Sequence, residues 1–152
     1  MSERELVIRA DEVAPFSLPG EAHIYASQCI IHRDGAGSQD LVLNRYTLKA
    51  HHANKGGVHE GNDEAYYVLR GKAKLTLGGT SAGDEDAKVY DIGPDTAVFI
   101  PAGTFHAVEN HSDEDLVILT FWPRQPLPGA NGIAEAREKA WGTQFRRVPR
   151  KE

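Results

Sequence analysis

Cysteine, basic charge and long apolar runs are all scarce in this sequence. Cys29 is the one cysteine among 152 residues, so an intramolecular disulfide is excluded. Lysine and arginine number 17 against 22 acidic residues, and the net charge of −5 provides no basic field that would attract nucleic acid. No apolar stretch reaches the roughly 18 residues of a membrane-spanning helix. We therefore expect neither a nucleic-acid partner nor a membrane partner.

The composition is otherwise that of an ordinary globular protein. Hydrophobic residues make up 40% and charged residues 26% of the chain. Its length fits one domain, since compact domains most often have about 100–150 residues. The opening residues 1–5 lack the basic-then-apolar order of a signal peptide, which, together with the single cysteine, predicts a cytoplasmic location.

Short β-forming runs alternate with turn residues through the middle of the chain. Residues 72–77 alternate polar and apolar and then meet Gly78 and Gly79, which predicts a half-buried strand followed by a hairpin turn. The other expected strands lie at 41–49, 66–69, 88–92, 97–100, 107–108 and 116–122. Short strands at nearly regular spacing are typical of a β-sandwich or β-barrel.

The two ends of the chain have a different character. Residues 10–20 are rich in turn formers and predict an irregular N-terminal arm. After Trp122 a series of prolines ends the sheet, because proline has no N–H to donate to a ladder. Asn131 can cap a short C-terminal helix over residues 133–140, which stops at Gly142.

Two segments carry residues that could bind a metal ion or take part in catalysis. The first contains His59 and Glu64, and six residues separate Glu64 from Gly71. The second reads Pro-Ala-Gly-Thr-Phe-His-Ala-Val-Glu-Asn over residues 101–110. These segments resemble the two motifs of the cupin family, of which the second is Pro-x-Gly, two residues, His, three residues, Asn. The second motif matches at each of these positions.

The resemblance spans roughly residues 41–122 and implies an all-β fold, a double-stranded β-helix or jelly-roll barrel. In this interpretation residues 1–40 hold the N-terminal arm and first strands of the same domain. Residues 41–122 form the cupin barrel, and residues 123–152 form an extension with the short helix. Cupins commonly pair, so the resemblance also implies a homodimer to which residues 1–20 contribute.

The resemblance further implies one divalent metal ion, held by His59, Glu64 and His106. Two imidazoles and one carboxylate suit Fe, Mn, Ni or Zn and leave open positions for substrate. The family's usual additional histidine falls on Gly57 here, so the set is incomplete. His51 and His52 are candidates for the missing nitrogen, and we favour His52; the alternative is a pair of solvent-facing turn histidines. A barrel that has lost its metal is the alternative for the whole set.

Period-two alternation predicts that Tyr66 and Val68 share the face of Glu64 while Tyr67 points away. Tyr66, whose hydroxyl could orient a substrate, and Glu60 are the candidate catalytic residues. A non-ligating His51 or His52 is a further candidate base. Side chains that could line the cavity, or belong to ordinary packing, are Tyr46, Phe99, Trp122 and Arg45.

Three functions remain open at this stage. The first is a metal-dependent isomerase, lyase or decarboxylase acting on a small oxygen-rich molecule such as a sugar, keto acid or hydroxy acid. The second is an Fe(II)-dependent dioxygenase, because two histidines and one carboxylate are also the ligands of that class. The third is a barrel that binds a small ligand without turnover.

Overall fold

The computed structural model describes residues 6–32, 36–59, 61–81 and 83–123, and these form an all-β domain. A short 3-10 turn, η1 (Ala10–Glu12), precedes the strands. The strands are β1 (Tyr25–Ile31), β2 (Val42–Leu48), β3 (Glu64–Arg70), β4 (Ala73–Leu77), β5 (Lys88–Ile92), β6 (Ala97–Ile100), β7 (His106–Glu109) and β8 (Leu116–Trp122). The helix predicted at 133–140 lies outside the described residues.

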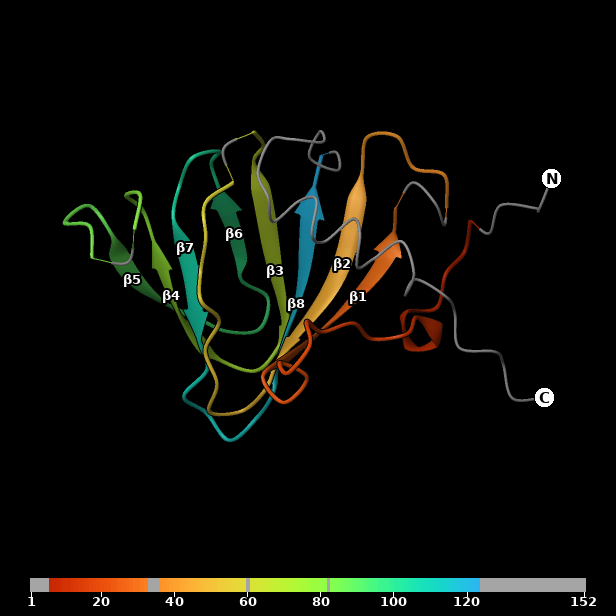
Figure 1. Cartoon of the computed structure of the whole chain (residues 1–152), viewed down its shortest axis with the longest axis horizontal. Helices are drawn as coiled ribbons and strands as arrows, with labels where there is room; N and C mark the ends of the chain where they lie inside the picture. The colour runs from red at the N-terminus through yellow and green to blue at the C-terminus, as the bar shows by residue number, and fades with distance from the viewer. Residues whose placement is uncertain (1–5, 33–35, 60, 82, 124–152) are drawn as a thin grey trace.

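The strands form two antiparallel sheets (Figure 1), and buried side chains from both sheets pack together in one core. One sheet has the order β1-β2-β8-β3-β6 and the other the order β5-β4-β7. The segment before β3 extends the smaller sheet, since Ala53 bridges to Glu109 and Gly57 to His106. The predicted all-β jelly-roll fold is thereby confirmed.

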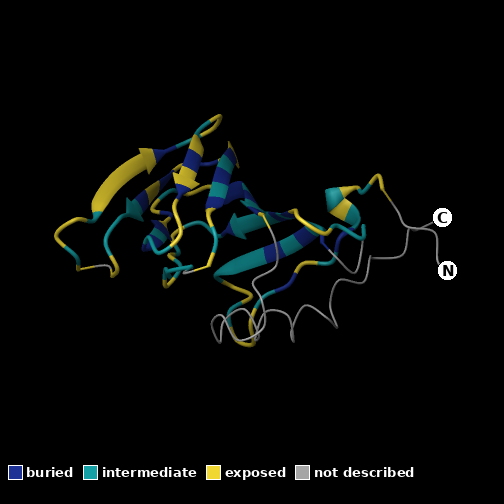
Figure 2. Cartoon of the chain, turned by 90° about the horizontal axis from the view of Figure 1, so that it is seen from above, coloured by how far each residue is buried: buried dark blue, intermediate teal, exposed yellow. Residues whose placement is uncertain are grey.

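Side chains alternate between the interior and the outer surface, as the period of a strand requires. In β3 the residues Glu64, Tyr66 and Val68 are buried, whereas Leu69 is 45% exposed. Figure 2 shows the same alternation of buried and exposed bands along the strands. The predicted placement of Tyr66 and Val68 on the face of Glu64 is consistent with this burial pattern.

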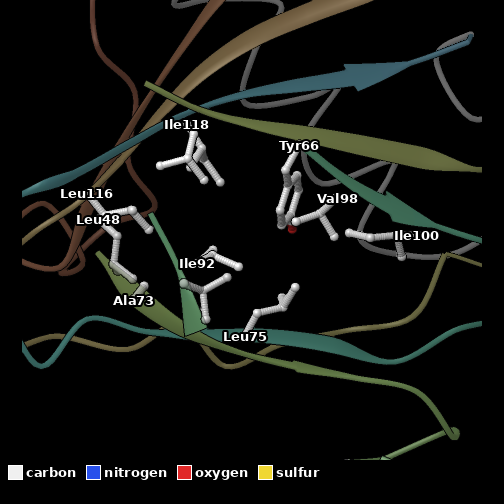
Figure 3. Close-up of a cluster of buried hydrophobic side chains, with 11 residues drawn as sticks. Leu48, Tyr66, Ala73, Leu75, Ile92, Val98, Ile100, Leu116 and Ile118 are labelled. Atoms are coloured by element: carbon white, nitrogen blue, oxygen red, sulfur yellow. The ribbon is translucent and has the colours of Figure 1, made fainter. Parts of the chain in front are cut away.

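The interior holds two separate hydrophobic clusters. Most of the larger cluster is drawn in Figure 3, where side chains from both sheets meet; Leu48, Leu75, Leu116 and Ile118 are 1% exposed or less. The smaller cluster lies where the arm meets the larger sheet and consists of Phe16, Cys29, Val42 and Trp122. Burial of these side chains, at about 25 cal/mol per Å² of apolar surface, is the main force that holds the sheets together.

The N-terminal arm is fixed to the edge of the larger sheet. Phe16 and Ser27 form an isolated bridge with hydrogen bonds in both directions, each 2.7 Å. The side-chain amide of Gln28 donates to the carbonyl groups of Ala10 and Val13 at 3.0 and 2.8 Å. The arm thus belongs to the same packed unit as β1.

Within the described ranges, no helix is long and apolar enough to cross a membrane.

Two strands begin earlier than the sequence pattern predicted, and both differences concern the site. β3 starts at Glu64, which pairs with Ile100, and β7 starts at His106, which exchanges two 3.0 Å backbone hydrogen bonds with Gly57. Both side chains therefore project from regular strands. A residue on a strand is held more rigidly than one on a loop, which suits a site that needs fixed geometry.

Candidate metal centre

Three ligand-type side chains converge between the two sheets. Glu64 comes from the larger sheet, His106 from the smaller sheet, and His59 from the segment that leads into β3. One nitrogen or oxygen atom from each residue lies within 4.8 Å of the others. Among the described residues, this is the one cluster of three His, Cys, Asp or Glu side chains close enough together to hold a metal ion. The group contains two imidazoles and one carboxylate, which are three of the four residues predicted as metal ligands.

The carboxylate of Glu64 is buried without a conventional partner. Its Oε2 lies 3.1 Å from Nε2 of His59 and 3.3 Å from Nε2 of His106, yet it has no partner with hydrogen-bond geometry among the described residues. A buried unpaired oxygen is costly unless something satisfies it. A cation between the three atoms would satisfy it, so the residues present fit a metal ion.

The electrostatics of Glu64 favour the charged form that a metal needs. Burial by itself raises the pKa of Glu64, but the neighbouring imidazoles of His106 and His59 together outweigh that effect and lower it to about 2. The side chain is therefore a carboxylate at neutral pH. An ionised carboxylate can coordinate a divalent ion without first losing a proton.

His106 is oriented by contacts behind the site. Its Nδ1 lies 3.1 Å from the carbonyl oxygen of Thr104, so this nitrogen carries the proton and donates it. Nε2 of the same ring points toward Glu64, and in the neutral imidazole this nitrogen carries the lone pair that a metal ion would need. The ring of Tyr66 packs edge-on against His106 with centroids 6.1 Å apart, and Trp122 packs in the same way against His59 at 6.4 Å. Both imidazoles are thus restrained by an aromatic neighbour.

The turn at Pro101 holds the loop that carries His59. Thr104 N–H donates to Pro101 C=O, and Gly103 stands third in this turn with φ of 77°, a conformation that favours glycine. Gly103 N–H in turn donates to the carbonyl of His59 at 2.7 Å. The second segment therefore contains one ligand-type side chain, His106, and positions another, His59.

Asn110, the last residue of that segment, has a structural role. Its side chain is 1% exposed and donates to the carbonyl groups of Leu48, Lys49 and Glu114 at 3.2, 3.3 and 2.8 Å. Its Oδ1 accepts from the N–H and hydroxyl of Ser112 at 3.0 and 2.8 Å. Asn110 thus joins the end of β2 to the turn before β8.

The site opens toward the side of His59 and Gly57. The side chain of His59 is 17% exposed, compared with 3% for Glu64 and 7% for His106. A Cβ atom added to Gly57 would meet nothing within 4 Å. Gly57 lies directly opposite His106 in an antiparallel pair, so such a Cβ would project from the same face of the sheet. The missing histidine leaves open space beside the ligands.

The structure places His52 away from this group. His52 lies opposite Asn110, whose backbone N–H donates to its carbonyl oxygen, whereas Gly57 lies opposite His106. Asn110 follows His106 by four residues, which at 3.3 Å per residue is about 13 Å along the sheet. The ring of His52 faces His23, and its Nδ1 contacts the carbonyl of Ala50 at 2.8 Å. His52 is therefore not brought to the other three predicted ligands.

His51 is also directed away from the three ligands. It is exposed and has φ of 59°, and its Nε2 lies 2.7 Å from a carboxylate oxygen of Asp113. His51 is thus a solvent-facing turn histidine, as in the alternative to ligation, whereas His52 is half-buried beside His23. Neither side chain supplies the nitrogen that Gly57 lacks.

The predicted catalytic and cavity-lining residues have mixed positions. Tyr66 is 6% exposed beside His106, and Figure 3 shows its ring pointing into the core near Val98. Glu60 lies outside the described residues. Phe99 is 63% exposed on the outer face, and Arg45 hydrogen-bonds Gln28 there, so neither side chain lines the interior.

Two buried polar residues near the site were not singled out from the sequence. Asn44 and Thr120 are 3% and 5% exposed on facing positions of β2 and β8. The available signal was a polar residue at an inward position of each predicted strand, since inward positions are normally apolar.

Comparison with known proteins agrees with this fold. The family model described as "Cupin domain" matches residues 44–122. No curated protein sequence matches the chain. Among solved structures, a predicted oxalate decarboxylase from Thermotoga maritima has 20% identity and a TM-score of 0.63, with 78% of this chain and 99% of that chain covered.

Two further structures are larger proteins. Bacillus subtilis oxalate decarboxylase at pH 4.6 has 21% identity, a TM-score of 0.65, and coverage of 76% of this chain and 28% of its own. The formate complex of Lactobacillus farciminis oxalate decarboxylase has 16% identity, a TM-score of 0.63, and coverage of 75% and 32%. This chain thus spans about a third of either enzyme, and the likeness is one of fold. The two sheets, the paired motifs and a family match over more than half of the sequence lead to one conclusion: the chain belongs to the cupin domain family.

Proposed function

We propose that this cupin is a metal-dependent enzyme that binds one divalent ion at His59, Glu64 and His106 and acts on a small oxygen-rich acid. The observation that carries the proposal is the buried Oε2 of Glu64, which faces two imidazole nitrogens and lacks a hydrogen-bond partner among the described residues. Mn(II) is the first ion to test, since Mn(II) centres are named for Bacillus subtilis oxalate decarboxylase. The donor set also suits Fe, Ni and Zn.

A divalent ion at this position would supply Lewis-acid chemistry, stabilising negative charge that develops on a bound carbonyl or carboxylate oxygen. The chain's own residues prepare the site. The carbonyl oxygen of Thr104 accepts a hydrogen bond from Nδ1–H of His106, so that Nε2 of His106 is free to bind a metal ion. Tyr66 and Trp122 restrain the two imidazoles, and burial strengthens the interaction of Glu64 with a cation. The open side at Gly57 and His59 would admit the substrate.

Decarboxylation is the reaction we would assay first. Of the three solved structures described above, two are named oxalate decarboxylase and one is named a predicted oxalate decarboxylase. Decarboxylation of an acid needs stabilisation of the charge left on carbon or oxygen. The proposed ion at His59, Glu64 and His106 would supply such stabilisation. A panel of oxalate, 2-oxo acids and 2-hydroxy acids, with release of carbon dioxide as the readout, would test the reaction class.

The metal itself is tested by elemental analysis and by titration with Mn(II), followed through the loss of the free-ion EPR signal. We expect near-stoichiometric binding in the parent and in His51→Ala, whose side chain is exposed and paired with Asp113. We expect loss of binding in His106→Ala and Glu64→Gln. Equal binding by all four proteins, or none by the parent, would contradict the proposal.

Oxygen activation is the second candidate, favoured by one observation. Two histidines and one carboxylate that leave neighbouring positions open are the ligands of non-haem Fe(II) oxygenases. The two candidates differ in their need for oxygen. Turnover that persists under anaerobic conditions, or with redox-inactive Zn(II) in place of Fe(II), would exclude the oxygenase.

A further inference from the structure

Asn44 and Thr120 form a polar pair in an otherwise apolar part of the interior. They lie directly opposite each other on β2 and β8, and Asn44 Nδ2 donates to Thr120 Oγ1 at 3.3 Å. Asn44 is 3% exposed and Thr120 5% exposed. The pair lies between the two hydrophobic clusters, because Val42 and Trp122 of the smaller cluster lie on one side and Leu48 and Ile118 of the larger cluster on the other.

The pair leaves hydrogen-bonding capacity unused. Asn44 Oδ1 is buried and has no hydrogen-bond partner among the described residues. Turning the amide over would expose Nδ2 to the same surroundings, so one polar atom of Asn44 is unpaired in either orientation. Thr120 accepts from Asn44, which leaves its hydroxyl hydrogen available to donate. An acceptor and a donor therefore lie side by side.

The position of the pair places it next to the candidate metal centre. Thr120 lies opposite Tyr66, and Glu64 precedes Tyr66 by two residues on the same face of β3. Thr120 and Glu64 are therefore diagonal neighbours, which on one face of a sheet are about 7–8 Å apart. A molecule of a few carbon atoms can span that distance. Asn44 is one strand further from Glu64.

We infer that Asn44 and Thr120 form a subsite for a hydroxyl group of the substrate, which rests on the proposed metal site and narrows its substrate class. A hydroxyl group can donate to Asn44 Oδ1 and accept from Thr120 at the same time. The substrate class is a small acid with metal-binding oxygens at one end and a hydroxyl group two or three carbons away. Fully ionised oxalate has no hydrogen to donate and is too short, so it fits this subsite poorly.

The test uses Mn(II)-loaded protein and two probes of equal size, 3-hydroxypropanoate and butanoate. They differ only in a terminal hydroxyl in place of a methyl group. We expect the parent to bind 3-hydroxypropanoate more tightly, by roughly five- to tenfold, because one buried hydrogen-bonded group typically contributes that much. Dissociation constants come from calorimetric titration of each probe.

The variants separate this subsite from the metal site. Asn44→Leu and Thr120→Val should keep Mn(II) binding but bind the two probes equally, whereas Thr120→Ser should keep the preference. Retained Mn(II) binding shows that a variant is folded. Because the two substitutions lie on different strands, one variant still provides the test if the other does not fold. Mn(II) binding by the parent without any preference for the hydroxyl probe would overturn the subsite alone. An unchanged preference in both Asn44→Leu and Thr120→Val would do the same, and the polar pair would then hold an ordered water only. Absence of Mn(II) binding would overturn the proposed function and the subsite together.

Discussion

Metal binding should stabilise this fold, because the proposed ligands come from both sheets. Glu64 belongs to the larger sheet and His106 to the smaller sheet, so an ion held by both would join them. An ion that binds only the folded protein, at a concentration a hundred times its dissociation constant, stabilises by about 2.7 kcal/mol. In a domain of this size each kcal/mol raises Tm by about 2–4 °C, so the expected rise is about 5–10 °C.

The assay is thermal unfolding with and without excess Mn(II), after treatment with a chelator. The parent and His51→Ala should show the full rise, and Glu64→Gln little or none. Each variant is compared with itself, so any effect of the substitution on the metal-free fold cancels. Glu64→Gln is suited to this purpose, since it keeps the size of a side chain that is 4% exposed. A rise of the same size in Glu64→Gln would refute the assignment of Glu64 as a ligand.

Three further outcomes are expected. Gly57→His should fold, because a Cβ at this position has open space around it. The added imidazole beside His106 should raise the affinity for Mn(II) by more than roughly tenfold. An unchanged affinity in a Mn(II) titration would contradict this. Gly71→Ala should lower the free energy of unfolding by roughly 2–3 kcal/mol in urea titrations, since Gly71 has φ of 86° and an added Cβ would lie 2.6 Å from the carbonyl oxygen of Asp115; a smaller loss than about 1 kcal/mol would show that the turn relaxes. Burial raises the pKa of the Cys29 thiol from 9.0 to about 12, so the folded protein keeps a proton that the unfolded chain releases between these values. Stability should therefore fall as the pH rises from about 9 toward 12, and urea midpoints for Cys29→Ala should lack this part of the decline; identical pH profiles would contradict it.

Much of the fold could be predicted because alternation and turn residues are local signals. The runs at 88–92, 97–100 and 116–122 coincide with β5, β6 and β8. The strand β1 had no bounds in the prediction, although first strands were expected before residue 41. Its residues carry a weak pattern, and its register includes an irregularity between Cys29 and Ile31.

The three ligand-type residues were predictable from motif spacing, but their surroundings were not. Spacing cannot tell whether His52 reaches the other ligands, since this depends on the path of residues 52–57 alongside β7. Likewise, the unpaired oxygen of Asn44 becomes evident only when the side chains across β2 and β8 are in place. In both cases the deciding contacts join residues far apart in the sequence.

The five side-chain hydrogen bonds of Asn110 show that the second motif combines two kinds of requirement. Asn110 and Gly103 maintain the shape of the barrel through backbone contacts and a turn, whereas His106 alone in that motif offers an atom to a ligand. The two requirements are physically separable. A chain could exchange the histidine for another residue and keep the architecture, so a match to this motif identifies the scaffold, and the chemistry must be read from the side chains that face the interior.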